Sequence, residues 1–306
     1  MNALRNGLAA AVVLATGIAA SAGSLEIQPV ADGVYALVGE KEQRSRENLA
    51  NNATFGVVVT GEGIVLIDPG GSWKGAEEID TAIREISGEP VKFVINTGGQ
   101  DHRWLGNGYW KAHGAAIIAS ADAVADQAER RSMQLAALET FLGDAIAGTE
   151  PVQAGIIFDD EYDFSLGGFD FRVVHPGAAH TPGDSYVWLP ARRTVFTGDI
   201  VYVERILGVG AQSRSASWLE SFESIAALEP EHVVPGHGRA TTLEKAKADT
   251  YDYLVNLREQ VGEHIEAGGD MITAVEVDQS AFEYLEQFDA LARRNAQQVF
   301  SEMEWE

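Results

Sequence analysis

Four apolar stretches of this chain each lead into a short turn that carries histidine or aspartate, and this arrangement restricts the fold more than any other feature. The first stretch, residues 91–95, is rich in β-branched residues and is followed by NTGGQDHRWLGN. The later turns are HTPGD at 180–184, TGD at 197–199 and PGHG at 235–238. Glycine, proline and aspartate are common in any turn. Four such turns, each after an apolar strand, predict one shared site at the edge of a sheet.

Strands and helices alternate between these turns. Apolar residues at 79, 82, 83 and 86 predict an amphipathic helix that ends before Gly88 and joins two strands. A strand, a crossover helix and a second strand predict right-handed α/β packing. Further strands are predicted at 25–40, 55–59, 64–68, 91–97, 115–119, 156–175, 186–189, 194–196 and 232–234, and helices at 104–113, 121–142, 218–228 and 242–303, the last one broken at Gly268-Gly269.

Two segments are predicted to be loops. Residues 41–52 are rich in charged and amide side chains and are predicted to lie on the surface. Residues 201–215, which include Arg205 and two glycines, fit either a lid over the site or an ordinary surface loop.

The absence of cysteine limits the chemistry of the site. The 306 residues contain no cysteine, which excludes disulfides, thiolate metal ligands and cysteine nucleophiles. A metal ion must therefore be held by imidazole and carboxylate groups.

The charge of the chain is strongly acidic. There are 46 acidic against 22 basic residues, for a formal net charge of −24. This excludes nucleic acid as a partner, because binding to phosphates needs a basic face. The excess is typical of a solvated acidic surface. It also disfavours strongly anionic substrates, unless a metal ion or local arginines offset it.

The N-terminus has the pattern of a secretory signal peptide over residues 1–22. Arg5 supplies the positive charge, residues 8–20 are apolar but too short to span a bilayer, and Ala20-Ser21-Ala22 is a cleavage site of small residues. We expect an exported protein, periplasmic or secreted, with no membrane segment after cleavage. Residues 23–260 are predicted to form one domain, and residues 261–306 a helical extension packed on it.

The order of the motifs resembles the metallo-β-lactamase superfamily over about residues 25–260. The matching segments are Asn96-Thr97, Asp101-His102, Gly106-Asn107, and the later turns given above. The resemblance implies an α/β fold, a four-layer αββα sandwich with two mixed sheets between helical layers. It also implies a site at one sheet edge, where members of the family commonly bind two zinc ions.

The first motif departs from the family pattern. The family usually has His-x-His-x-Asp-His where this chain has Gly98-Gly-Gln-Asp-His-Arg103. An ungapped comparison puts His102 at the Asp position and Arg103 at the final His position. A shift by one residue restores Asp101-His102 as the Asp-His pair, but it needs a deletion and an insertion. Both registers remain open, and in both of them the two leading imidazoles are lost.

The resemblance then implies one metal ion, held by His102, His180, Asp199 and His237. Zinc with an open water position fits such ligands, and iron or manganese is possible with the same set. Asp101 is expected to act as the general base or to orient the water.

Three further residues are expected to support the site or to contact substrate. Asp68 either forms a turn or supports a metal ligand. Gln100 offers a neutral oxygen. Arg103 either neutralises a substrate anion or pairs with a carboxylate.

These inferences favour an exported metal-dependent hydrolase that acts on a small molecule with a carbonyl-type group. One alternative is an accessory protein of sulfur oxidation or of a quinoprotein. Another is a binding protein without catalysis on a degenerate metallo-β-lactamase fold. The sequence does not indicate an oligomeric state.

Overall fold

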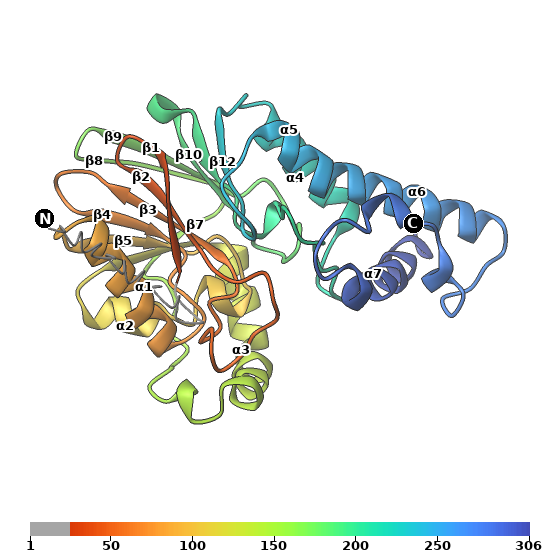
Figure 1. Ribbon diagram of the computed structural model, residues 1–306, viewed down its shortest axis with the longest axis horizontal. Coiled ribbons are helices and arrows are strands. Elements are labelled where there is room, and N and C mark those ends of the chain that lie inside the picture. The colour runs from red at the N-terminus through yellow and green to blue at the C-terminus, as the bar shows by residue number, and fades with distance from the viewer. Residues whose placement is uncertain (1–24) are drawn as a thin grey trace, which may run out of the picture.

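The computed structural model describes residues 25–306, so the predicted signal peptide lies outside the described residues. Two β-sheets are packed face to face (Figure 1). The first sheet has the strand order β1 (Glu26–Ala31), β2 (Val34–Val38), β3 (Thr54–Val59), β4 (Ile64–Ile67), β5 (Val91–Ile95), β6 (Ala116–Ser120), β7 (Ile156–Phe158). The second has the order β12 (His232–Val234), β11 (Thr194–Phe196), β10 (Tyr186–Leu189), β9 (Phe169–Val174), β8 (Glu161–Leu166).

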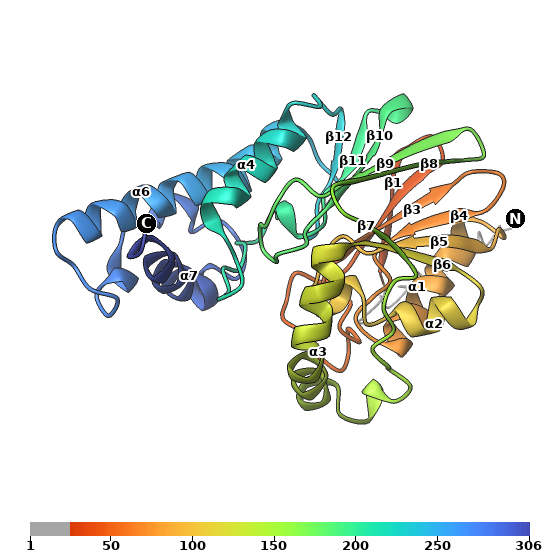
Figure 2. The ribbon, with the colours of Figure 1, turned by 180° about the vertical axis from the view of Figure 1, so that it is seen from behind.

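Helices cover the outer face of each sheet, which confirms the predicted αββα sandwich (Figures 1 and 2). Those on the first sheet are α1 (Trp73–Ile86), α2 (Asn107–Ala112) and α3 (Ala121–Leu142). Those on the second are α4 (Ser215–Ala226), α5 (Leu243–Ala246), α6 (Asp252–Glu266) and α7 (Phe288–Met303). In both views α4, α6 and α7 extend to one side of the sheets.

Alternating side chains explain why the sheets form the two middle layers. In β4, Ile64 and Leu66 pack toward α1, while Val65 and Ile67 pack between the sheets. In β10, residues 186 and 188 pack toward α4 and α6, while 187 and 189 pack between the sheets. All four positions of each strand are buried. Because successive side chains point to opposite faces, strands that are apolar throughout need cover on both faces.

Parallel pairing brings the motif turns to one edge. β4, β5 and β6 are parallel neighbours, and β11 is parallel to β12. The carboxyl ends of parallel strands lie at the same edge of their sheet. The turns after β4, β5, β11 and β12 therefore meet where the two sheets adjoin.

The two surface-loop predictions are wrong only in part. In the first segment residues 41–47 are partly or fully exposed. Asn48, Asn51 and Asn52 in the first are almost fully buried, and the side-chain amide of Asn51 donates to the carbonyl of Gly75 at 2.9 Å. Residues 200–203, 206 and 207 are apolar and fully buried in the core of the second sheet. Polar composition failed as a signal for the first segment because amide side chains satisfy backbone groups inside the fold as well as water does.

The predicted helices are partly wrong in their limits. The C-terminal helical region is not broken only at Gly268-Gly269, because residues 267–287 form short turns between α6 and α7. Asp270 accepts from the backbone N–H of Thr273, and Asp278 from that of Ser280. Such local bonds offer the backbone an alternative to the helix. The helix predicted at 104–113 is shorter, because α2 begins only at Asn107 and ends at Ala112, after a single 3₁₀ turn at Asp101–Arg103.

The C-terminal helices share an apolar core with the second sheet. Leu254, Val261, Ala296 and Val299 belong to the same buried cluster as Val233 of β12. Among residues 25–306, no helix combines the length and the apolar character needed to cross a membrane.

Candidate functional site

Three side chains from three different turns meet at the sheet edge. His102 follows β5, Asp199 follows β11 and His237 follows β12. The Nε2 atoms of His102 and His237 lie 3.2 Å from Asp199 Oδ2 and Oδ1, respectively. All three residues are buried. Their ligand atoms lie within 4.8 Å of one another. Among residues 25–306, no other group of three or more histidine and acidic side chains meets this limit.

The spacing of these atoms fits a metal ion. Ligand atoms about 2.0–2.1 Å from a tetrahedral zinc lie about 3.3 Å apart. Each imidazole nitrogen lies 3.2 Å from one oxygen of Asp199, and one donor atom from each residue lies within 4.8 Å of the others. Two imidazoles and a carboxylate are donors that zinc, iron and manganese accept. The residues present therefore fit a divalent metal ion.

Both ring nitrogens of His102 have polar neighbours. Nδ1 lies 3.1 Å from Nη2 of Arg44 and 3.2 Å from Asp101 Oδ1, and Asp101 forms a two-pronged ion pair with Arg44. Because a guanidinium only donates and a carboxylate only accepts, a proton on Nε2 satisfies both the contact of Nδ1 with Arg44 and the contact of Nε2 with Asp199. An ion bound at Nε2 would displace that proton. Burial opposes ionisation of Asp101, but Arg44 outweighs it and holds the pKa of Asp101 far below its usual range.

Arg103 pairs with buried carboxylates and does not line the cavity. It is fully buried and donates to Asp68 at 2.8 Å and to Asp199 at 2.7 Å. It also donates to the backbone carbonyls of Thr54 and Gly236. Burial alone would raise the pKa of Asp199, but Arg103 and His102 hold it well below its ordinary value.

One guanidinium faces two carboxylates in this cluster, because Arg103 donates to both Asp68 and Asp199. Burial raises the pKa of Asp68, and Arg103 and Thr97 oppose that rise. Asp68 is also fixed by the N–H and hydroxyl of Thr97. Asp68 is therefore connected to the candidate ligand Asp199 through Arg103. Its backbone φ of 67° lies in the left-handed region, which is typical of a residue in a tight turn.

His180 and Gln100 lie on the same cavity but outside the group of three. The Nδ1 atom of His180 is 2.9 Å from the carbonyl oxygen of Gly208, which assigns the proton to Nδ1 and leaves Nε2 without one. Burial lowers the pKa of His180 to about 4, so the ring is neutral near pH 7. Gln100 accepts from Arg130 at 3.3 Å through its side-chain oxygen.

The two glycines of the first motif leave no space for a side chain. A Cβ at Gly98 would come within 2.4 Å of Asp184 Oδ1, and one at Gly99 within 1.7 Å of Asp126 Oδ2. Carboxylates of the surrounding turn and of α3 thus fill the region. Because Asp101 points to Arg44 and His102 points to Asp199, the geometry favours the ungapped register of the motif.

We expect the carboxyl group of Asp184 to make the stability of the metal-free protein depend on pH. Burial and the charge of Asp199 raise its pKa from 3.8 to about 8. Between those values the folded state keeps a proton that the unfolded state releases, so the free energy of unfolding falls as the pH rises from 3.8 to about 8. We expect Asp184→Asn to weaken this fall, as measured by urea unfolding from pH 5 to 8. An unchanged pH dependence would contradict the assignment.

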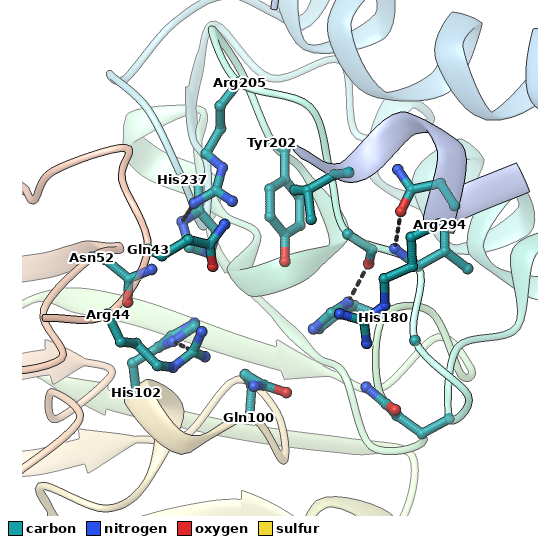
Figure 3. Close-up of a pocket in the computed structure, with 16 residues that line it drawn as sticks. Gln43, Arg44, Asn52, Gln100, His102, His180, Tyr202, Arg205, His237 and Arg294 are labelled. Carbon is teal, nitrogen blue, oxygen red and sulfur yellow. Dashed lines mark hydrogen bonds between the residues drawn. The ribbon is translucent and has the colours of Figure 1, made fainter. Parts of the chain in front are cut away.

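A polar cavity of about 170 Å³ is lined by His102 and His237 of the group of three, and by His180 (Figure 3). Tyr202 stacks on His237 with ring centroids 4.5 Å apart, and Figure 3 shows its hydroxyl directed into the cavity. Burial and the charge of Asp199 raise the pKa of Tyr202 well above 10. The hydroxyl therefore keeps its proton near neutral pH and can donate a hydrogen bond.

Sequence reasoning missed Arg44, Tyr202 and Arg294, all of which line the cavity. Arg44 lies in the segment that was predicted to be a surface loop, and Arg294 lies on α7, far from every motif. Only Tyr202 had a local signal, since it follows the TGD turn by three residues.

A family model described as the metallo-beta-lactamase superfamily matches residues 50–237. Among similar sequences, the metallo-beta-lactamase type 2 of Elizabethkingia meningoseptica is 26% identical over 61% of this chain and 69% of its own length. The 2,4-dinitroanisole O-demethylase subunit alpha of Nocardioides sp. (strain JS1661) is 23% identical over 61% of this chain. The match spans only 53% of the length of that subunit.

Solved structures show the same fold. A metallo-beta-lactamase from Pontibacter korlensis superposes with a TM-score of 0.60 at 23% identity and covers 76% of this chain and 100% of its own. The DIM-1 metallo-beta-lactamase exposed to ceftazidime gives a TM-score of 0.58 at 20% identity, with 76% of this chain and 97% of its own covered.

Proposed function

This chain belongs to the metallo-β-lactamase superfamily, and from that premise we propose that it is an exported hydrolase that uses one metal ion, most simply zinc. The observation that carries the proposal is the buried group His102, Asp199 and His237, whose donor atoms lie within 4.8 Å of one another. The two glycines of the first motif supply no ligand, which supports one ion and not two.

The residues around this group have defined roles in the proposal. A bound divalent ion supplies an activated water and polarises the substrate carbonyl. Arg103 fixes the carboxylate of Asp199 from the side away from the cavity. Asp101 forms an ion pair with Arg44 beside Nδ1 of His102, so it is a positioning residue in this proposal, and its low pKa makes it too weak a base to act as the general base.

Two groups on the cavity wall face the substrate. The Tyr202 hydroxyl can donate to the carbonyl oxygen as negative charge develops there. His180, with an unprotonated Nε2, can accept a proton or complete the ligand set by a side-chain rotation.

Metal removal and return test this function. Protein purified without chelator is assayed against an ester, a thioester, a lactone, a β-lactam and an aryl methyl ether, the last two because of the named relatives. We expect one class to be hydrolysed, the activity to disappear with chelator, and a single ion per chain to restore it. Negligible metal content with no activity on adding zinc, iron or manganese would favour the non-catalytic alternative. Oxygen consumption with bound iron would favour the sulfur-oxidation alternative.

A further inference from the structure

The cavity has a charge opposite to that of the protein. The chain has 46 acidic and 22 basic residues, yet the residues that line this cavity include three arginines and no aspartate or glutamate. One of the three, Arg44, is neutralised by Asp101. The other two, Arg205 and Arg294, form no ion pair within 4.0 Å in the part of the chain that the structure describes.

Arg205 is a buried cation without a counter-ion in contact. Only 4% of its surface is exposed, and its Nε atom is buried with no hydrogen-bond partner. Within residues 25–306 its side chain forms one hydrogen bond, from Nη1 to Nδ1 of His237 at 3.5 Å. A charge held in this way destabilises a fold unless an anion or water compensates it.

Arg294 comes from a different part of the chain. It is an exposed residue of α7, which lies outside residues 50–237 of the family match. The neighbouring Asn295 anchors this helix to the cavity wall, because its side chain accepts from Val209 N–H and donates to the Leu207 carbonyl, both at 2.8 Å. Figure 3 shows Arg294 beside His180 and Arg205 beside His237, with Tyr202 between them.

We propose that Arg205 and Arg294 bind a carboxylate of the substrate, so that the C-terminal helix α7 is part of the substrate site. The substrate of the proposed hydrolase then carries a carboxylate in addition to the acyl bond that is hydrolysed. This inference rests on the proposed function, because it takes the anion to be the substrate. Guanidinium groups suit this role because they donate in a planar fork that matches a carboxylate. The exposed Arg294 attracts the anion at the mouth, and the buried Arg205 holds it near the candidate metal group.

Binding to metal-free protein tests the site without any turnover. Glutarate and glutaramide, which have the same length and differ in charge, are titrated by calorimetry at constant ionic strength. We expect glutarate to bind at least about tenfold more tightly than glutaramide, since hydrogen bonds to charged groups are the stronger ones. Equal affinities would overturn the proposal.

The variants Arg294→Gln and Arg293→Gln form a matched pair. They are adjacent on α7 and remove the same charge, but Arg293 pairs with Glu276. We expect only Arg294→Gln to weaken glutarate binding, several-fold, with glutaramide unaffected. If both variants lose the same glutarate affinity, the loss is explained by the change in net charge, and Arg294 does not form part of a carboxylate site.

A second variant, Arg205→Gln, should weaken glutarate binding more than Arg294→Gln does. Unchanged binding in this folded variant would also refute the site. If glutarate binds as expected but no substrate is hydrolysed, the anion site stands and the proposed function fails. If hydrolysis occurs without preference for an anionic over a neutral ester, the function stands and this inference fails.

Discussion

Replacing His237 by alanine will remove the metal ion from the purified protein and with it the hydrolytic activity. The imidazole provides one of three donor atoms that lie within 4.8 Å of one another, and two remaining ligands hold a divalent ion poorly. We expect metal content to fall from one ion per chain to near zero, and activity to fall by at least about a hundredfold, because loss of supporting residues alone lowers metal affinity by about 10–100-fold.

The control for this variant is His232→Ala. His232 lies at the start of the same strand, β12, but outside the group of three. Metal content is measured by plasma mass spectrometry, and folding by far-ultraviolet circular dichroism. Retention of the ion by folded His237→Ala protein would contradict the proposed ligand set.

Replacing Arg103 by alanine will cause the largest loss of stability that we expect from a single change in the site. The side chain is fully buried and joins Asp68, Asp199 and two backbone carbonyls. Its removal leaves two buried carboxylates without their counter-ion, and breaking a buried pair in this way costs about 3–5 kcal/mol. The urea midpoint of the metal-free protein measures the loss.

Two comparisons separate the causes of this loss. Arg103→Lys keeps the charge but cannot reach two carboxylates at once, so its midpoint should lie between those of the wild type and Arg103→Ala. A bound divalent ion at Asp199 should reduce the loss. Equal midpoints for Arg103→Ala and wild type would show that Asp68 and Asp199 do not depend on this guanidinium.

The resemblance of four motifs predicted the family and the αββα sandwich, and both are confirmed. The reason is physical. The two middle layers depend on strands that are apolar throughout, such as β4 and β10, and such runs are visible in the chain. The same motifs placed His102, Asp199 and His237 at strand ends, and parallel pairing brings strand ends together.

What the tertiary structure alone decided is how the charged side chains pair. The sequence left Arg103 free to bind substrate or a carboxylate, and only the fold shows it between Asp68 and Asp199. It also suggested Asp101 as a base, whereas the fold pairs Asp101 with Arg44, from a loop 57 positions earlier.

The same holds for the cavity wall. Arg294 is far from every motif, and no periodicity predicts that α7 returns to the site. Local patterns determine strands, helices and turns because these depend on neighbouring residues. The partner of a buried charge is determined by contacts between segments distant in sequence, which the order of residues does not display.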